Sequence, residues 1–126
     1  MVDGLLDSSV VIDLIRKHPP AQQWLTQQQS VLGVSALVWL EILEGAQNKR
    51  DQRLALRVLK RFVRVSLEST DLDWAIQQAA KLVLSHRVDA MDCLIASINH
   101  RLQVPLYTRN LKHFTPLLGA LALSPY

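Results

Sequence analysis

The sequence predicts an α/β fold in which a central parallel β-sheet carries helices on both faces. Short apolar runs of strand type alternate along the chain with longer segments of helical periodicity. Strands that alternate with helices pair in parallel through crossovers, which buries both faces of the sheet. The 126 residues are 49% hydrophobic and 20% charged, as in globular proteins, and predict a single domain over 1–126. The one cysteine excludes an internal disulfide.

Two strands and four helices are expected in the first half of the chain. The first strand passes directly into a helix, which is expected to end at Pro19 and Pro20 because proline interrupts a helix. Ser35 is a good N-cap and is expected to begin the third helix. In order, the expected elements are a strand over 4–6, helices from about 9 and over 21–28, a strand over 31–34, and helices over 36–47 and 49–62.

The second half is expected to hold two amphipathic helices and three short strands. Asp89 and Asp92 are spaced as in a capping box, with Asp89 at the N-cap of the second of these helices. Residues 108–110 are expected to form a turn directly after a strand. In order, the expected elements are a strand over 63–67, helices over 69–85 and 89–101, and strands over 104–107 and 121–123.

Three acidic residues interrupt apolar stretches on separate segments. Asp7 follows the first strand, Glu41 lies within an apolar helix, and Asp92 opens another helix. The carboxyl ends of parallel strands form the crevice where open α/β sheets bind ligands, and a carboxylate there is costly unless its charge is compensated. Converging carboxylates repel one another and need a cation. Oxygen ligands without Cys/His spacing suggest Mg²⁺ or Mn²⁺, ions that commonly act on phosphates.

Each of these residues also has a plainer interpretation. Asp7 would be part of a helix cap. Glu41 would be a surface residue at the edge of its helix, and Asp92 would only complete the capping box with Asp89. The two roles of Asp92 are compatible, because the helix dipole keeps a first-turn carboxylate ionised, as a metal ligand must be. Residues 108–110 would be an ordinary turn.

The basic residues are unevenly distributed. The net charge is +3, and seven of the 14 Lys and Arg residues lie within 49–64. Their spacing places four of them in one stripe along a helix. This stripe would be a solvated face, a surface for phosphate backbones or a surface for a partner protein. Its members are Arg50, Arg53, Arg57 and Arg61.

No segment has the features of a membrane span or a secretion signal. The N-terminus has no basic region before an apolar core, and the longest apolar run is interrupted by Ser35. We therefore expect a cytoplasmic protein without a membrane partner. A Walker loop and a GxGxxG motif are both absent, which disfavours an enzyme with a nucleotide cofactor.

Four segments and the closing stretch resemble, in order, the motifs of PIN-domain ribonucleases. The chain also has the length of the VapC-type toxins of type II toxin–antitoxin pairs. Each motif alone is weak, but four in register make a specific signature that spans nearly the whole chain. The segments are LLDSSVV (5–11), VSALVWLEILEG (34–45), DCLIAS (92–97), PLYTRNLKHF (105–114) and GALALSP (119–125).

The resemblance implies a PIN fold and hydrolysis of RNA phosphodiester bonds that depends on Mg²⁺ or Mn²⁺. By motif position, Asp7, Glu41 and Asp92 are the expected catalytic and metal-binding acids. Asn110 is a further expected catalytic residue and stands where the family often has a fourth acid. His113 stands where another acid is common. Because neither is acidic here, the expectation of a second, tightly bound metal ion is weakened, although Asp89 would compensate if it does more than cap its helix.

The resemblance also implies a division of roles. Asp7 and Asp92 are expected to hold an ion at the scissile phosphate, while Glu41 or Asp7 orients the attacking water. Asn110 is expected to fix water or phosphate by hydrogen bonds. The residues expected to position the substrate are Thr108, Arg109 and Ser8.

The predicted function is that of a metal-dependent endoribonuclease, the toxin of a toxin–antitoxin pair. The resemblance further implies a homodimer and a small antitoxin protein whose tail lies along the acidic groove. An alternative is a catalytically weak PIN-fold module that acts through RNA or a protein partner. A phosphatase of the haloacid dehalogenase type with Asp7 as nucleophile is disfavoured, because Ser9 stands where those enzymes usually have a second acid.

Overall fold

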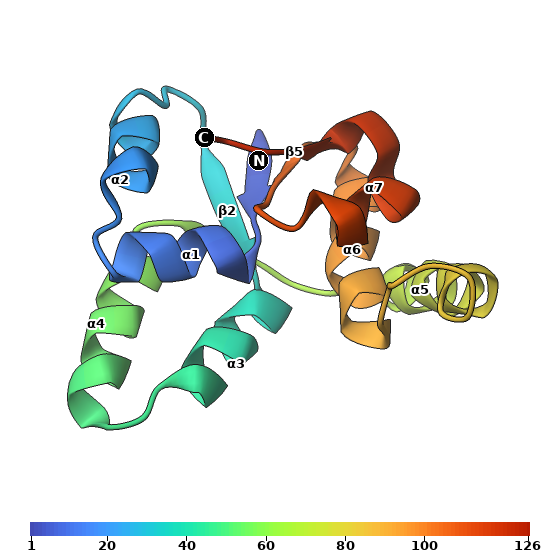
Figure 1. The fold of residues 1–126 in the computed structure, drawn as a ribbon, viewed down its shortest axis with the longest axis horizontal. Coiled ribbons are helices and arrows are strands. Elements are labelled where there is room, and N and C mark those ends of the chain that lie inside the picture. Colours follow the sequence, from blue (N-terminus) through green and yellow to red (C-terminus); the bar gives the residue numbers. More distant parts are fainter.

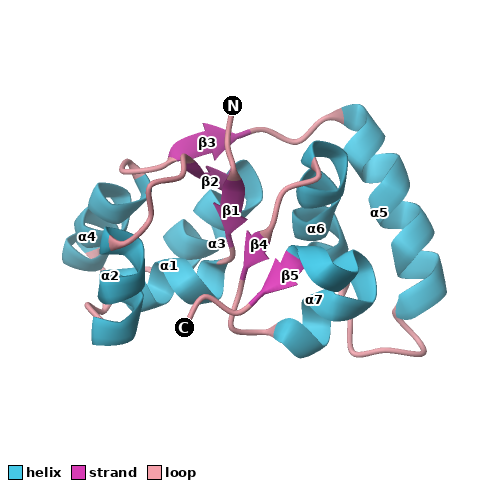
Figure 2. Ribbon diagram, turned by 90° about the horizontal axis from the view of Figure 1, so that it is seen from above, coloured by secondary structure: helices cyan, strands magenta, loops and turns pink.

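The central sheet has five strands. They are β1 (Gly4–Leu6), β2 (Leu32–Ser35), β3 (Val63–Val65), β4 (Leu106–Tyr107) and β5 (Ala122–Leu123). The computed structural model, which describes residues 1–126, pairs them all in parallel in the order β3-β2-β1-β4-β5 (Figure 2). The strand order therefore reverses beside β1. Such a reversal opens a crevice at the carboxyl ends of the strands that flank it, which is a common place for ligands.

Seven helices flank the strands on two sides. They are α1 (Ser8–Ile15), α2 (Pro19–Thr26), α3 (Ala36–Gly45), α4 (Lys49–Leu59), α5 (Ser69–Leu82), α6 (Ala90–Leu102) and α7 (Leu111–Leu118), followed by a short 3₁₀ helix, η1 (Gly119–Leu121). Figure 1 shows α1 to α4 on one side of the strands and α5 to α7 on the other. The predicted α/β class with helices on both faces is confirmed. None of these helices combines the length and the apolar character needed to cross a bilayer.

Proline explains two differences from the sequence prediction. α2 begins at Pro19, two residues earlier than predicted, because proline suits the first turn of a helix, where its missing N–H is not needed. α7 was not predicted, and it contains Pro116. It also buries Phe114, Leu117 and Leu118. Three such side chains contribute about 6 kcal/mol, more than the ~3 kcal/mol cost of an interior proline.

The other predicted elements are present, several of them shorter at their ends. α3 ends at Gly45 because the chain must leave the helix before Asn48, which caps α4. The Asn48 side chain accepts a hydrogen bond from the Asp51 N–H at 2.9 Å. Ser35 caps α3 as predicted, and its hydroxyl oxygen accepts the Val38 N–H at 3.2 Å.

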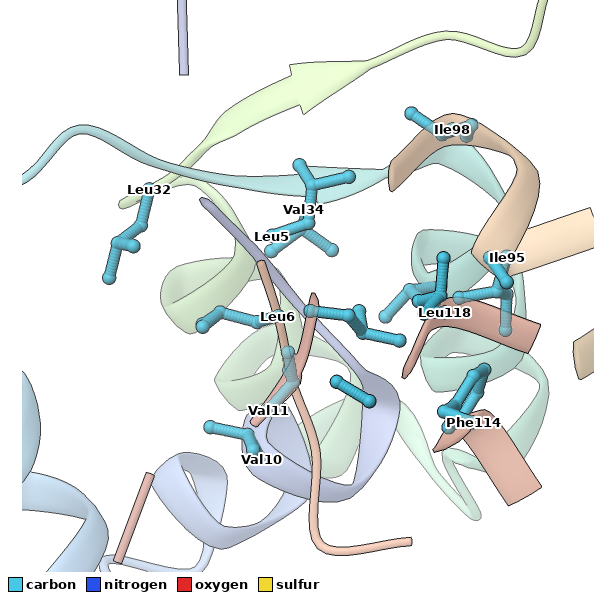
Figure 3. Close-up of a cluster of buried hydrophobic side chains, with 14 of the residues drawn as sticks. Leu5, Leu6, Val10, Val11, Leu32, Val34, Ile95, Ile98, Phe114 and Leu118 are labelled. Carbon is cyan, nitrogen blue, oxygen red and sulfur yellow. The ribbon is translucent and has the colours of Figure 1, made fainter. Parts of the chain in front are cut away.

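A cluster of 24 buried apolar residues holds β1 in the middle of the molecule. Figure 3 shows Leu6 of β1 with Val10 and Val11 of α1 on one side and Phe114 of α7 on the other. Each of these four side chains is at most 1% exposed. Side chains packed this closely resist displacement, so the end of β1 has little freedom to move. Asp7, the next residue after Leu6, is therefore presented from a rigid position.

Candidate active site

Asp7 joins β1 to α1 and is 3% exposed. It occupies the N-cap of α1, as the plainer interpretation expects, but its side chain makes no capping hydrogen bond and is left for other partners. Instead, Asp7 Oδ2 accepts hydrogen bonds from Ser9 Oγ at 2.9 Å and from Thr108 Oγ1 at 2.8 Å. No basic side chain forms an ion pair with it. A buried carboxylate supported by hydroxyl groups alone lacks a compensating charge.

Glu41 of α3 shares a hydroxyl group with Asp7. Ser8 Oγ lies 3.1 Å from Glu41 Oε1 and 3.4 Å from Asp7 Oδ1. Because a hydroxyl has one proton to donate, Ser8 serves the nearer Glu41 and leaves Asp7 Oδ1 without a donor of its own. Burial raises the pKa of Glu41, the bond from Ser8 opposes this, and the charges of Asp7 and Asp92 raise it further. Glu41 thus belongs to an acidic cluster and is not an ordinary surface residue.

Asp92 combines a capping role with membership of the same cluster. Asp89 accepts the Asp92 N–H at 2.8 Å, and Asp92 Oδ2 accepts the Asp89 N–H at 3.2 Å, so the predicted capping box is confirmed. The same Oδ2 lies 3.2 Å from His113 Nδ1. Burial raises the pKa of Asp92, and the backbone hydrogen bond with Asp89 opposes this increase. The charges of Asp89 and Asp7 raise the pKa further, whereas the charge of His113 lowers it.

The charges of Asp7 and Asp92 both raise the pKa of Glu41, and the charge of Asp7 raises the pKa of Asp92, so we refer to these three acids as the acidic cluster. As they stand, no three His, Cys, Asp or Glu side chains are close enough to form a ligand group for a metal ion. Glu41 is directed to Ser8, and Asp92 to His113 and its own cap. The donor chemistry nevertheless fits a hard divalent cation, because every donor is an oxygen, the carboxylates repel one another, and Asp7 lacks a donor for one oxygen.

The turn after β4 brings Thr108 to this cluster. Thr108 is 0% exposed, and its hydroxyl, which donates to Asp7, accepts the Asn110 N–H at 2.9 Å. Asn110 itself is exposed, and its side chain makes no capping bond at the start of α7. The amide group of Asn110 is therefore free for a ligand. The expected turn is therefore held at the site by the Thr108 hydroxyl, which bonds to Asp7 on one side and to the Asn110 N–H on the other.

Arg109 points away from the acidic cluster. Its guanidinium group donates to Asp13 Oδ2 at 2.8 Å, whereas its backbone N–H donates to Ser9 Oγ at 3.1 Å. Asp13 also accepts the Tyr126 hydroxyl at 2.6 Å. The sequence analysis did not identify the roles of Ser9 and Tyr126. For Ser9, its position two residues after Asp7 is a usable signal, but nothing in the sequence connects Tyr126 with the site.

An open groove of about 520 Å³ extends from the cluster between α1, α3 and α4. Ser8 and Glu41 line the end next to the cluster, and the apolar side chains of Ile12 and Ile42 line its course. The groove is therefore mixed in character: Glu41 and apolar side chains line it, and so do the charged residues Arg16 and Asp51. Such a surface can accept a polypeptide that carries both charged and apolar side chains.

The basic stripe is exposed and contributes no ion pair. Its first three residues lie on α4, but this helix ends at Leu59, earlier than predicted, so the last residue of the stripe lies in the turn that follows. Its four side chains are free to contact phosphate groups or a partner protein, so both interpretations remain open beside a solvated face. They are Arg50, Arg53, Arg57 and Arg61.

Several solved structures share this architecture. A toxin–antitoxin complex from Klebsiella pneumoniae matches with a TM-score of 0.80 at 20% identity, over 98% of each chain. VapBC-1 from nontypeable Haemophilus influenzae matches at 0.75 and 22% identity, over 90% of this chain and 91% of that chain. The Mycobacterium tuberculosis toxin VapC20, described as cleaving the sarcin–ricin loop, matches at 0.74 and 10% identity over 98% of each chain. Identities this low establish a common fold alone.

Among curated proteins, no sequence matches this chain. The family profile described as PIN domain matches residues 4–114. That range runs from β1 into α7 and contains Asp7, Glu41, Asp92 and the turn that carries Thr108. Because the match covers most of the sequence and contains the strands β1 to β4 and the three acids, this chain belongs to the PIN domain family.

Proposed function

We propose that this protein is a metal-dependent endoribonuclease that hydrolyses RNA phosphodiester bonds and acts as the toxin of a toxin–antitoxin pair. The observation that carries the proposal is the uncompensated charge at Asp7, a carboxylate 3% exposed that has hydroxyl donors alone and lies near Glu41 and Asp92. Membership of the PIN domain family supports it. The likeness to a toxin–antitoxin complex from Klebsiella pneumoniae and to VapBC-1 from Haemophilus influenzae also supports it.

In this proposal, Asp7, Glu41 and Asp92 hold Mg²⁺ or Mn²⁺. Their oxygen donors suit either ion. Both contacts of Asp92 with Asp89 and His113 use Oδ2, which leaves Oδ1 available as a ligand. When bound, such an ion polarises the scissile phosphate and makes a water molecule a better nucleophile. The positive charge of the ion would thereby compensate the negative charges of the three acids.

The side chains around the acids have separate roles in the proposed reaction. Glu41 accepts the proton of the attacking water, because its raised pKa brings it closer to neutral pH than an ordinary carboxyl group. Thr108 holds Asp7 through a 2.8 Å hydrogen bond. The free amide of Asn110 binds water or a phosphate oxygen. Ser8, next to Glu41, positions the RNA directly, whereas Arg109, whose guanidinium is bonded to Asp13, helps to position it through the turn that carries Thr108.

We also propose a small antitoxin protein as a partner. A tail with a cationic side chain near Glu41 and apolar side chains beside Ile12 and Ile42 would match the groove between α1, α3 and α4. Such a tail would neutralise the acids and exclude RNA. Addition of the antitoxin should therefore abolish RNA cleavage, and Ile12→Asp, at a groove side chain that is 37% exposed, should weaken this inhibition.

A homodimer in the cytoplasm completes the proposal. The exposed apolar side chains of Leu40 and Ile76 are 64% and 66% exposed and offer surface for a second copy. Sedimentation of the purified protein measures the oligomeric state directly. A monomer at all concentrations up to about 100 μM, a range in which a micromolar dimer would be populated, would contradict this part of the proposal.

The decisive experiment is cleavage of total RNA by purified protein with Mg²⁺ or Mn²⁺. The matched lanes contain EDTA or the Asp7→Asn variant, which keeps the size of the side chain and removes its charge. Discrete fragments that disappear in both lanes are the expected result. Intact RNA in every lane, from folded protein free of antitoxin, would refute the nuclease function.

A binding module without efficient catalysis is the second candidate function. Two observations favour it: Asn110 supplies no fourth acid, and no three acidic or histidine side chains are grouped as they stand. In that case Asp7→Asn would leave both RNA binding and the effect on cell growth unchanged. For a nuclease, the same substitution removes the growth effect while RNA binding persists.

A further inference from the structure

Tyr126 lies at one end of a hydrogen-bond network that runs from the surface to Asp7. Its hydroxyl donates to Asp13 Oδ2 at 2.6 Å, and Arg109 Nη1 donates to the same oxygen at 2.8 Å. The Arg109 guanidinium also lies over the Tyr126 ring, 5.4 Å from its centroid. The network continues inward, because the Arg109 N–H donates to Ser9 Oγ and Ser9 donates to Asp7 Oδ2. Figure 2 shows the chain after β5 returning toward α1, where Asp13 lies.

We propose that Asp13 and Tyr126 are positioning residues for the reaction at Asp7. They clamp Arg109, and the clamped Arg109 fixes the turn over 108–110 against the buried carboxylate. We call Asp13, Arg109 and Tyr126 the brace. The inference rests on the proposed function of the acidic cluster, but the position of the turn can be measured independently of activity.

Within the turn, Arg109 has the least support from the backbone, whereas the Asn110 carbonyl accepts the N–H groups of His113 and Phe114 at the start of α7. β4 ends at Tyr107, and the last hydrogen bond between this segment and the sheet runs from the Thr108 N–H to the Leu123 carbonyl, at 2.9 Å. Arg109 takes part in no backbone–backbone hydrogen bond. Its position therefore depends on side chains, namely Ser9 on the inner side and the brace on the outer side.

The brace is poorly placed to stabilise the fold. The Arg109 side chain is 46% exposed, so solvent screens its ion pair with the less exposed Asp13, and the pair contributes little to folding. The ring of Tyr126 packs edge-on against Trp24, with centroids 6.3 Å apart, and this contact does not need the hydroxyl. Removal of the hydroxyl should therefore loosen Arg109 without unfolding the protein. Small displacements of groups that support a reacting centre reduce the rate strongly.

Tyr126→Phe tests the brace, because it removes the bond to Asp13 and keeps the ring. Tyr107→Phe is the matched control: the Tyr107 ring packs against the same Trp24, at 4.9 Å, but its hydroxyl makes no hydrogen bond with another residue. Asp13→Ala removes the shared acceptor, and the double variant combines it with Tyr126→Phe.

Three properties are measured for each variant. They are kcat and KM on an RNA oligonucleotide that the wild type cleaves, the affinity for Mn²⁺ by calorimetry, and hydrogen exchange of the Arg109 amide. We expect Tyr126→Phe to lower kcat about tenfold with unchanged KM, as for residues that orient metal ligands, and to speed exchange. Its thermal midpoint should stay within about 2 °C of the control. The double variant should equal Asp13→Ala alone, because both changes act through Asp13.

Equal kcat and equal exchange of the Arg109 amide in Tyr126→Phe and Tyr107→Phe would overturn the brace. Failure of the nuclease function has a different signature, since the wild type would then cleave no RNA at all. In that event the exchange measurement still decides whether the brace positions the turn. Faster exchange in Tyr126→Phe alone would support it, and the same rate in both variants would overturn it.

Discussion

Replacement of Thr108 by valine isolates the contribution of one hydroxyl to the acidic cluster. The Thr108 side chain is 0% exposed and donates to Asp7 Oδ2 at 2.8 Å. Valine has a similar shape and cannot donate. A hydrogen bond to a charged group contributes about 1.5–3 kcal/mol, and the Asn110 N–H, which also loses its partner, is on an exposed residue and can bond to water. We therefore expect the free energy of unfolding to fall by about 2 kcal/mol.

Urea denaturation without added metal measures this loss, and RNA cleavage with Mn²⁺ measures its effect on the site. We expect about a tenfold lower kcat, because an unsupported carboxylate is a less well oriented ligand. Thr115→Val, on the exposed face of α7, is the control for the substitution itself, and Thr108→Ser should restore most of both properties. Equal unfolding free energies for Thr108→Val and Thr115→Val would refute the argument that this hydroxyl supports Asp7.

Three further predictions concern other parts of the molecule. Because the pKa of Glu41 is raised in the folded protein, its ionisation lowers the free energy of unfolding as the pH rises above the ordinary value of 4.5. Glu41→Gln should therefore stabilise the metal-free protein at pH 7 by up to about 1 kcal/mol, although it should abolish cleavage. Thermal unfolding should show no such gain at pH 3.5. Asp71, 2% exposed and 2.9 Å from Arg101 Nε, holds α5 to α6, so Asp71→Asn should cost about 3 kcal/mol in urea denaturation. If the basic stripe contacts phosphates, the double variant Arg53→Glu and Arg57→Glu should weaken RNA binding and reduce the salt dependence of that binding. The free energy of unfolding should change by no more than about 0.5 kcal/mol, because both residues are exposed. An unchanged salt dependence would show that the stripe faces solvent or a protein.

The fold was predictable because most of its elements carry local signals. Ser35 and Asp89 begin helices through hydrogen bonds that residues three positions away complete. Alternation of short apolar runs with helical periodicity predicts the parallel sheet, and the sheet is parallel. α7 was not predicted, because Pro116 argues locally against a helix while the burial of Phe114 that sustains it depends on the rest of the core.

The acidic cluster was predictable for a related reason. Asp7, Glu41 and Asp92 each stand among apolar residues, so the hydrophobic pattern that places the core also places the acids beside it. The brace, in contrast, could not be predicted from the sequence. Asp13 and Tyr126 are 113 positions apart, and their contact depends on how the chain returns after β5, which no local pattern specifies.

The acidic cluster also explains why the end of β1 is so firmly packed. The charge of Asp7 raises the pKa of both Glu41 and Asp92, so their ionisation opposes folding, and a loosely held segment would relieve this repulsion by moving apart. The fully buried side chains of Leu6, Val10 and Val11 prevent that movement on one side of Asp7. The hydroxyl of Thr108 and the anchored turn prevent it on the other. The electrostatic repulsion is therefore retained in the folded protein, and under the proposed function a divalent cation would relieve it.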